Sequence, residues 1–308
     1  MFSLAEQKKD CRKNRINFTF VQKDGYFMVR NPMNIHQVSK VTVTPQNAEC
    51  LVFWTKNPSF SFIENLPKLD EKGLKDDFQC TSTSYSQDIE KSVSRKTEII
   101  EKFQKLSNQI GKEKVIWRYD PIILNKKYNF DYHIKYFDYI AEKLSAYTEK
   151  VIISFVDCYS KIKTRLQENE ITDLTQEQMR KLGIALKQIA EKHNLKTESC
   201  SETIDFDDIG IPHGHCIDGE LINRICQRNF IFKKYKTQRK ECGCVTSVDI
   251  GSYNTCRHNC AYCYATWNGI IPNSIDNSSP LLGSVLSNED KVTERKIPVL
   301  KEYNPELF

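Results

Sequence analysis

Three cysteines stand close together near the C-terminus, in the stretch TCRHNCAYCY at residues 255–264. Cys256, Cys260 and Cys263 fall within eight consecutive residues, so one tight loop can bring their thiols to three irons of a cubane cluster. Fully ligated clusters take four cysteines, so this trio leaves one iron open. A zinc knuckle and a set of unligated structural thiols are the alternatives. The spacing favours a 4Fe-4S cluster.

An iron without a protein thiolate can bind a small molecule. In radical enzymes the usual occupant is S-adenosylmethionine, held through its amino and carboxylate groups, and the reduced cluster cleaves its carbon–sulfur bond to give an adenosyl radical. Tyr262, directly before Cys263, is placed to pack near the adenine. The trio therefore predicts a radical enzyme with S-adenosylmethionine as cofactor, an unidentified substrate and an external electron donor.

Four further cysteines precede the trio in the last third of the chain: Cys200, Cys216, Cys242 and Cys244. They could hold a second iron–sulfur cluster or a zinc ion, with His213 or His215 in place of one thiol. The spacing Cys242-Gly243-Cys244 fits metal ligands and ordinary packing alike, because a free cysteine behaves as a small buried hydrophobe.

The composition favours an ordinary globular protein of the cytoplasm. Of the 308 residues, 39% are hydrophobic and 28% charged, the start MFSLAEQKKDCRKNR lacks the apolar core of a secretory signal, and no apolar run could span a membrane. A reducing compartment does not favour disulfides, so the 12 cysteines point to metal binding. The net charge of +5 comes without a lysine or arginine block, so nucleic acid binding is permitted but not indicated.

The elements that must position these thiols form a repeated unit, a short apolar run followed by an amphipathic helix. The apolar runs lie at residues 50–55, 78–83, 115–119, 151–156 and 195–200. Strands that alternate with helices predict a parallel sheet. We therefore expect an α/β fold, a complete or partial (β/α) TIM-like barrel at residues 1–200, with a cysteine-rich iron–sulfur segment at 201–308 packed on it.

Polar side chains follow the predicted strands, at the edge where the sites of such barrels gather. The candidates to orient cofactor or substrate are Lys56, Arg118, Asp120 and Glu202. Cys158 is a candidate for a hydrogen-atom donor or an acid–base group. The alternative is that these tips are ordinary turns, with Arg118 and Asp120 as a structural ion pair.

The chain resembles the microbial family called domain of unknown function 1848, on several quoted stretches. They are VRNPMN at 29–34, VFWTKNP at 52–58, VIWRYDPIIL at 115–124, ISFVDCYSK at 153–161 and QRKECGCVTSVDIGSYNTCRHNCAYCYA at 238–265. The cysteine motif is also similar to that of the radical S-adenosylmethionine superfamily. The resemblance implies this fold and a radical-type cysteine cluster, and it assigns no substrate.

Two departures from these families bear on the site. Residues 1–22 lack the Ser-Arg-Arg-Thr-Asp-like end of the usual first strand, which is expected to be missing or replaced. The chain also has no Gly-Gly pair for the amine of the cofactor, so Glu202 or backbone from another strand takes that role, or the open iron binds something else. The other functions left open are a non-catalytic iron–sulfur electron-transfer or redox protein and a zinc-stabilised module that binds nucleic acid.

Overall fold

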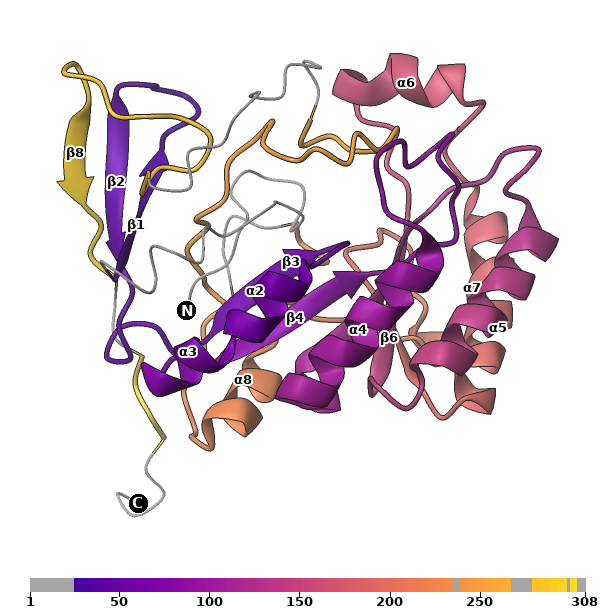
Figure 1. Ribbon diagram of the computed structural model, residues 1–308. Coiled ribbons are helices and arrows are strands. Elements are labelled where there is room, and N and C mark those ends of the chain that lie inside the picture. The colour runs from indigo at the N-terminus through magenta and orange to yellow at the C-terminus, as the bar shows by residue number, and fades with distance from the viewer. Residues whose placement is uncertain (1–24, 235–238, 267–278, 298–299, 304–308) are drawn as a thin grey trace.

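A computed structural model describes residues 25–234, 239–266, 279–297 and 300–303 of the chain. Its centre is a sheet of five parallel strands in sequence order (Figure 1). The strands are β3 (Leu51–Thr55), β4 (Asp76–Thr81), β5 (Val115–Ile122), β6 (Lys150–Phe155) and β7 (Lys196–Ser199). The predicted α/β fold with a parallel sheet is confirmed.

Helices follow the strands, as the repeated unit predicts. The α-helices are α2 (Phe60–Asn65), α3 (Pro67–Glu71), α4 (Lys96–Ile110), α5 (Phe130–Leu144), α6 (Lys163–Glu168), α7 (Gln176–Lys192) and α8 (Gly219–Cys226), and the short 3-10 helices are η1 (Lys112–Lys114), η2 (Ser160–Ile162) and η3 (Asp207–Ile209). Figure 1 shows α2, α3 and α4 side by side in front of the sheet, with α5 and α7 beyond them. Helix α7 begins with a capping box between Thr175 and Gln178, which closes the first turn.

The order of the strands is that of part of a (β/α) barrel. Strands β3 and β7 lie at the two edges of the five-stranded sheet. Beside β7, Ser199 N donates to Pro212 O at 2.9 Å and Gly214 N donates to Ser199 O at 2.7 Å. The segment after β7 therefore extends that edge. Among the described residues the sheet has two edges and is not a closed barrel, and the partial barrel stays a prediction.

A second, three-stranded sheet stands beside the first (Figure 1). Strand β1 (Tyr26–Arg30) is antiparallel to β2 (Gln37–Thr42), and β8 (Lys291–Glu294) pairs in parallel with β2. This pairing joins residues on either side of the predicted boundary at residue 200, and the division into two domains stays a prediction. The expected loss of the first strand concerns residues 1–22, which lie outside the described residues.

The two faces of the parallel sheet are filled differently. On β5, Trp117 stacks on Phe137 of α5 with ring centroids 4.8 Å apart, so this face packs under the helices. The alternate residue Arg118 points the other way and donates to the sulfur of Cys216. The segment around Cys216 thus packs on the inner face. Among the described residues no helix is long and apolar enough to cross a membrane.

Candidate functional site

The loop that carries the cysteine trio is paired with the segment after β4. Ala261 N donates to Ile89 O at 2.8 Å, and His258 O accepts a hydrogen bond from Ser92 N at 3.0 Å. Glu90 and Cys260 form an antiparallel bridge between these two bonds. The loop therefore lies at the carboxyl-terminal edge of the parallel sheet, where barrel enzymes place their sites.

The three thiols differ in exposure. Cys260 is buried at 5% exposure against Val93 and Ile99, whereas Cys256 and Cys263 are half-buried. Burial, with the negative charge of Glu90 next, raises the pKa of the Cys260 thiol. One thiol is therefore sheltered, and two lie closer to solvent.

Arg165 of α6 fixes the same loop from another side. Its Nη2 donates to Cys263 O at 2.5 Å and its Nη1 donates to Cys260 O at 3.4 Å. These bonds go to the backbone of the loop, so they set its shape without using the sulfurs. Figure 1 shows this part of the chain running beneath α6.

A buried carboxylate, Glu90, joins the loop to the sheet. Its Oε1 accepts hydrogen bonds from Lys56 Nζ at 2.7 Å, from Thr83 Oγ1 at 2.6 Å and from the Tyr262 hydroxyl, while Oε2 pairs with Lys96. The carboxylate is 1% exposed. Burial would raise the pKa of Glu90, but Lys56 and Lys96 outweigh burial and hold it at about 2. We call Glu90 with these four partners the Glu90 network.

The Glu90 network includes two of the residues predicted from the sequence, Lys56 and Tyr262. Lys56, at the end of β3, points to Glu90, and its Nζ lies 5.8 Å from the centroid of the Tyr262 ring. Tyr262 therefore faces the network through its hydroxyl, and its predicted contact with an adenine stays a prediction. Sequence reasoning missed Glu90, which lies in a polar loop without a spacing signal.

Arg118 and Asp120 lie deeper than the predicted mouth. Arg118 Nη2 pairs with Asp120 Oδ2 at 2.7 Å, both side chains are fully buried, and Ser154 donates to the second oxygen of Asp120. Arg118 Nη1 also contacts Gln79 Oε1 at 3.3 Å and Cys216 Sγ at 3.1 Å. The guanidinium thus belongs to the inner face of the sheet, where it meets one cysteine of the second set.

That second set gathers from separate segments. Cys200 Sγ and Cys216 Sγ are 3.1 Å apart, and Ile217 N donates to Cys244 Sγ at 3.4 Å. Cys242 is buried beside Gly243, where an added Cβ would come within 2.1 Å of the ring of His215. The contact with Cys216 and burial raise the pKa of Cys200.

A site for a single metal ion requires more than nearby side chains, because the ligand atoms must converge on one point. Within the described ranges, no three His, Cys, Asp or Glu side chains surround a point where one ion could sit. In a cubane cluster each thiolate binds a different iron, so such ligands need not converge on one point. The three cysteines of the trio lie in one loop, with three and two residues between them, and their binding of such a cluster stays a prediction.

The remaining candidates lie at the ends of β6 and β7. Glu202 Oε1 accepts a hydrogen bond from Phe155 N at 2.9 Å, so it ties the two strand ends together. The half-buried Cys158 has its backbone N bonded to Asp173 Oδ1 at 3.1 Å, and burial and Asp173 raise the pKa of its thiol to about 12. A thiol with that pKa stays protonated at neutral pH.

Comparison with known proteins places the chain in one family. The family model described as domain of unknown function (DUF1848) matches residues 18–265, which is most of the chain and includes the cysteine trio. Neither a curated protein nor a solved structure matches the chain.

Proposed function

We propose, from the premise that this chain belongs to the family described as domain of unknown function 1848, that it is an iron–sulfur enzyme of the radical S-adenosylmethionine type. One observation carries the proposal. Three cysteines of a single loop lie at the carboxyl-terminal edge of a parallel sheet, held there by the buried Glu90 network. An edge of this kind is where a barrel positions cofactor and substrate together.

In this proposal Cys256, Cys260 and Cys263 hold a 4Fe-4S cluster and leave one iron open. The bound cluster and S-adenosylmethionine, with an electron from an external donor, supply an adenosyl radical to a substrate of unidentified class. The chain itself fixes the loop. Arg165 bonds two of its carbonyls, and Glu90 holds the Tyr262 hydroxyl.

The other predicted residues take narrower roles. Lys56 stands at a strand end beside the loop and is the candidate to orient a ligand there. Glu202 at the end of β7 is the candidate acceptor for the amine of the cofactor, in place of the absent Gly-Gly turn. Arg118 and Asp120 act as positioning residues, because their ion pair is buried beneath the edge. Cys158 is kept as a candidate hydrogen-atom donor, since it carries its proton.

A second metal site is proposed at the inner-face cysteines, as an iron–sulfur cluster bound by Cys200, Cys216, Cys242 and Cys244. A zinc ion, the alternative, would need these thiols to converge on one point, which they do not do in the described residues. Two N–H···S contacts support it, from Arg118 to Cys216 and from Ile217 to Cys244. Such contacts around sulfur stabilise thiolate ligands and tune the metal that they bind.

The first experiment reconstitutes the cluster anaerobically and replaces all three trio cysteines by alanine. The parent is expected to show brown absorbance, bound iron and sulfide, and a paramagnetic signal after reduction. The triple variant should lose that signal. A control variant with Cys158→Ala and Cys226→Ala, two half-buried cysteines outside both sets, should keep it. Equal iron and sulfide in parent and triple variant would refute the assignment.

The second experiment separates an enzyme from an electron carrier. The reduced protein should convert S-adenosylmethionine to methionine and 5′-deoxyadenosine, because one electron breaks the carbon–sulfur bond and the adenosyl group then gains a hydrogen atom. A cluster whose spectrum ignores S-adenosylmethionine and yields neither product would favour the redox protein. A colourless zinc protein would favour the nucleic-acid-binding module.

The third experiment addresses the inner-face cysteines. The triple variant, which lacks the cysteine trio, should still bind metal. Adding Cys242→Ala and Cys244→Ala to it should remove that metal and lower the stability of the protein, since a structural metal contributes folding free energy. A triple variant that is folded and free of metal would rule out the second site.

A further inference from the structure

A cavity of about 600 Å³ opens beside the cysteine loop, at the carboxyl-terminal edge of the sheet. Its walls come from the segment after β4, the start of α4 and one lysine: Ser84, Tyr85, Ser86, Gln87, Asp88, Glu90, Val93, Ser94, Arg95, Lys96 and Lys127. Glu90 and Val93 are shared with the cysteine loop, since Glu90 bridges Cys260 and Val93 packs on it. The volume is that of a small-molecule site.

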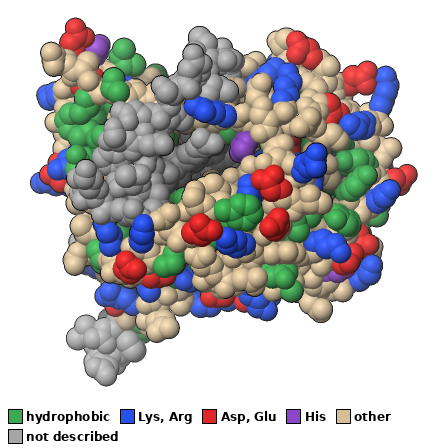
Figure 2. Space-filling model, in the orientation of Figure 1, with side chains coloured by type: hydrophobic (Ala, Val, Ile, Leu, Met, Phe, Trp, Pro, Cys, Tyr) green, Lys and Arg blue, Asp and Glu red, His purple; other side chains and the backbone are tan. Residues whose placement is uncertain are grey.

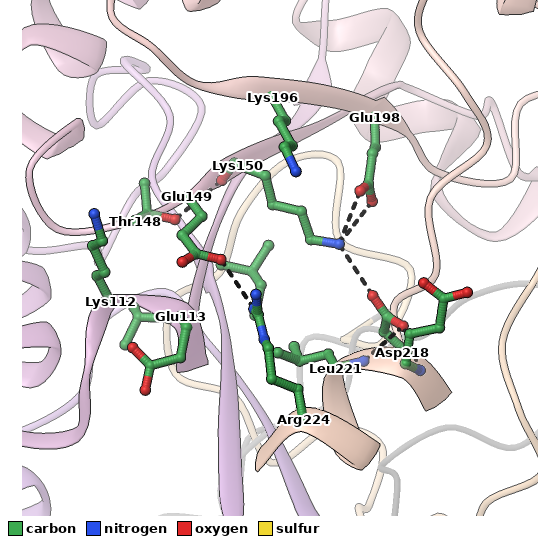
Figure 3. Close-up of a pocket in the computed structure, with 13 residues that line it drawn as sticks. Lys112, Glu113, Thr148, Glu149, Lys150, Lys196, Glu198, Asp218, Leu221 and Arg224 are labelled. Carbon is green, nitrogen blue, oxygen red and sulfur yellow. Dashed lines mark hydrogen bonds and ion pairs between the residues drawn. The ribbon is translucent and has the colours of Figure 1, made fainter. Parts of the chain in front are cut away.

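A second cavity, of about 270 Å³, lies at the opposite edge of the sheet, where β5, β6 and β7 begin. Figure 3 shows that its central cation, Lys150, is held by two carboxylates, Glu198 at 2.9 Å and Asp218 at 3.2 Å. Arg224 is likewise paired with Glu149 at 2.9 Å. Five carboxylates outnumber four cationic side chains in its walls. The side chains in these walls therefore carry a net negative charge, which disfavours an anionic ligand.

The cavity beside the cysteine loop has the opposite balance, with three cationic side chains against two carboxylates. Lys127 pairs with Asp88 at 2.9 Å, and Lys96 pairs with Glu90. Arg95 is exposed. Its charge acts on Glu98 of the same helix, but among the described residues Glu98 is ion-paired with Lys102, at 2.5 Å, and not with Arg95. Of the three cations in these walls, the guanidinium of Arg95 is therefore the one left to an incoming ligand.

We infer that this cavity binds a hydrophilic small molecule through an anionic group, a carboxylate or a phosphate, contacted by Arg95. The planar guanidinium presents two parallel donors that match either group. The polar residues Ser84, Ser86, Gln87 and Ser94 line the rest, so the remainder of the ligand is polar as well. Lys96 and Lys127 stay paired with Glu90 and Asp88, and their charges still add to the positive electrostatic potential in the cavity.

The inference goes beyond the proposed function and does not depend on it, because Arg95, which contacts the anion, belongs neither to the cysteine trio nor to the Glu90 network. The full-length protein is dialysed to equilibrium against radiolabelled inorganic phosphate, and separately against radiolabelled acetate, both as purified and after cluster reconstitution. At least one of the two anions is expected to bind at millimolar concentration. The anion that binds more tightly identifies the group that the cavity prefers.

Arg95→Gln should weaken binding of that anion at least tenfold, and Arg95→Lys should weaken it less, because lysine keeps the charge but loses the fork. Arg224→Gln is the matched control at the opposite cavity and should leave binding unchanged. Binding should also fall with added salt, since Arg95 is exposed. Absence of binding by the parent, or equal binding by the parent and Arg95→Gln, would overturn the inference. Loss of the cluster alone would leave it standing.

Discussion

The helix-covered face and the inner face of the parallel sheet hold their buried polar groups in contrasting ways. Under the helices, the Tyr119 hydroxyl lies 2.8 Å from His133 Nδ1 and 3.2 Å from Ser84 Oγ, and His133 Nε2 donates to Ile123 O at 2.8 Å. This chain of hydrogen bonds carries no charge. On the inner face, the buried Arg118 and Asp120 form an ion pair that reaches Cys216.

The two kinds of network differ in what they contribute to the stability of the fold. Neutral hydrogen bonds satisfy buried polar atoms at little electrostatic cost. A buried ion pair stabilises the fold less than its Coulomb energy suggests, because both charges lose their hydration. A fold that keeps such a pair beside Cys200 and Cys216 therefore places a fixed positive charge next to sulfur. On the face seen in Figure 2, acidic and basic side chains are interspersed.

The largest loss of stability is expected from replacing Arg118 on the inner face. We expect Arg118→Ala to lower the free energy of unfolding by about 3–5 kcal/mol, because it leaves Asp120 buried without its partner. Urea denaturation followed by circular dichroism measures this. Arg180→Ala, which removes a surface pair with Asp208, is the control and should cost less than about 1 kcal/mol. Similar losses in the two variants would mean that the inner pair is not special.

The neutral face predicts a pH dependence through His133. Burial lowers the pKa of His133 to about 4 from the ordinary value of 6.5. Between these values the unfolded chain binds more protons, so stability falls as pH drops from 6.5 to 4, by about 3 kcal/mol at most. His133→Gln should lack that part of the slope when unfolding is measured across this range. A parent and variant with parallel profiles would show that His133 is charged in the folded protein.

Ser154 tests the inner network at a single bond. Ser154→Ala removes the hydroxyl that donates to Asp120 Oδ1, and we expect a loss of about 2 kcal/mol because that oxygen is buried. Thermal unfolding of the two proteins gives the difference. Ser145→Ala, at the end of α5, serves as the comparison and should stay near the parent. An unchanged melting curve for Ser154→Ala would show that Asp120 finds another donor.

The smallest expected effect concerns Tyr119. Tyr119→Phe keeps the ring that packs on Phe137 and removes only the hydroxyl, so the cost should be about 1 kcal/mol. Nuclear magnetic resonance of the imidazole should also show a changed Nδ1 environment at His133. A loss as large as that of Arg118→Ala would erase the contrast between the faces.

The repeated unit in the sequence predicts the parallel sheet, since apolar runs and helical periodicity are local signals. The capping box of Thr175 and Gln178 is local in the same way, and the structure has it. The sheet of β1, β2 and β8 was not predicted, because residues 37–40 pair with residues 291–294, far along the chain. Pairing over such a separation leaves no mark in a short window.

The candidate site likewise has parts that local sequence signals predict and parts that depend on contacts between distant residues. Spacing alone brings the cysteine trio together, but it does not reveal Glu90, whose partners come from β3, α4 and the loop itself. Arg118 was placed at the mouth because it follows an apolar run, whereas it lies within β5 and alternation turns it inward. Contact between Cys200 and Cys216 likewise depends on the segment that runs beside β7.

The bond between Tyr262 and Glu90 joins residues 172 positions apart, and this separation fixes an order of assembly. Strands β3 to β7 pair only with their neighbours in sequence, so all five exist once residue 199 has been synthesised. Contacts between distant segments form after local ones, because a long loop must first be closed. We therefore expect β3 to β7 to pair before the cysteine loop docks on their edge, since Cys256 is synthesised after residue 199, and β8 at Lys291–Glu294 to join later still.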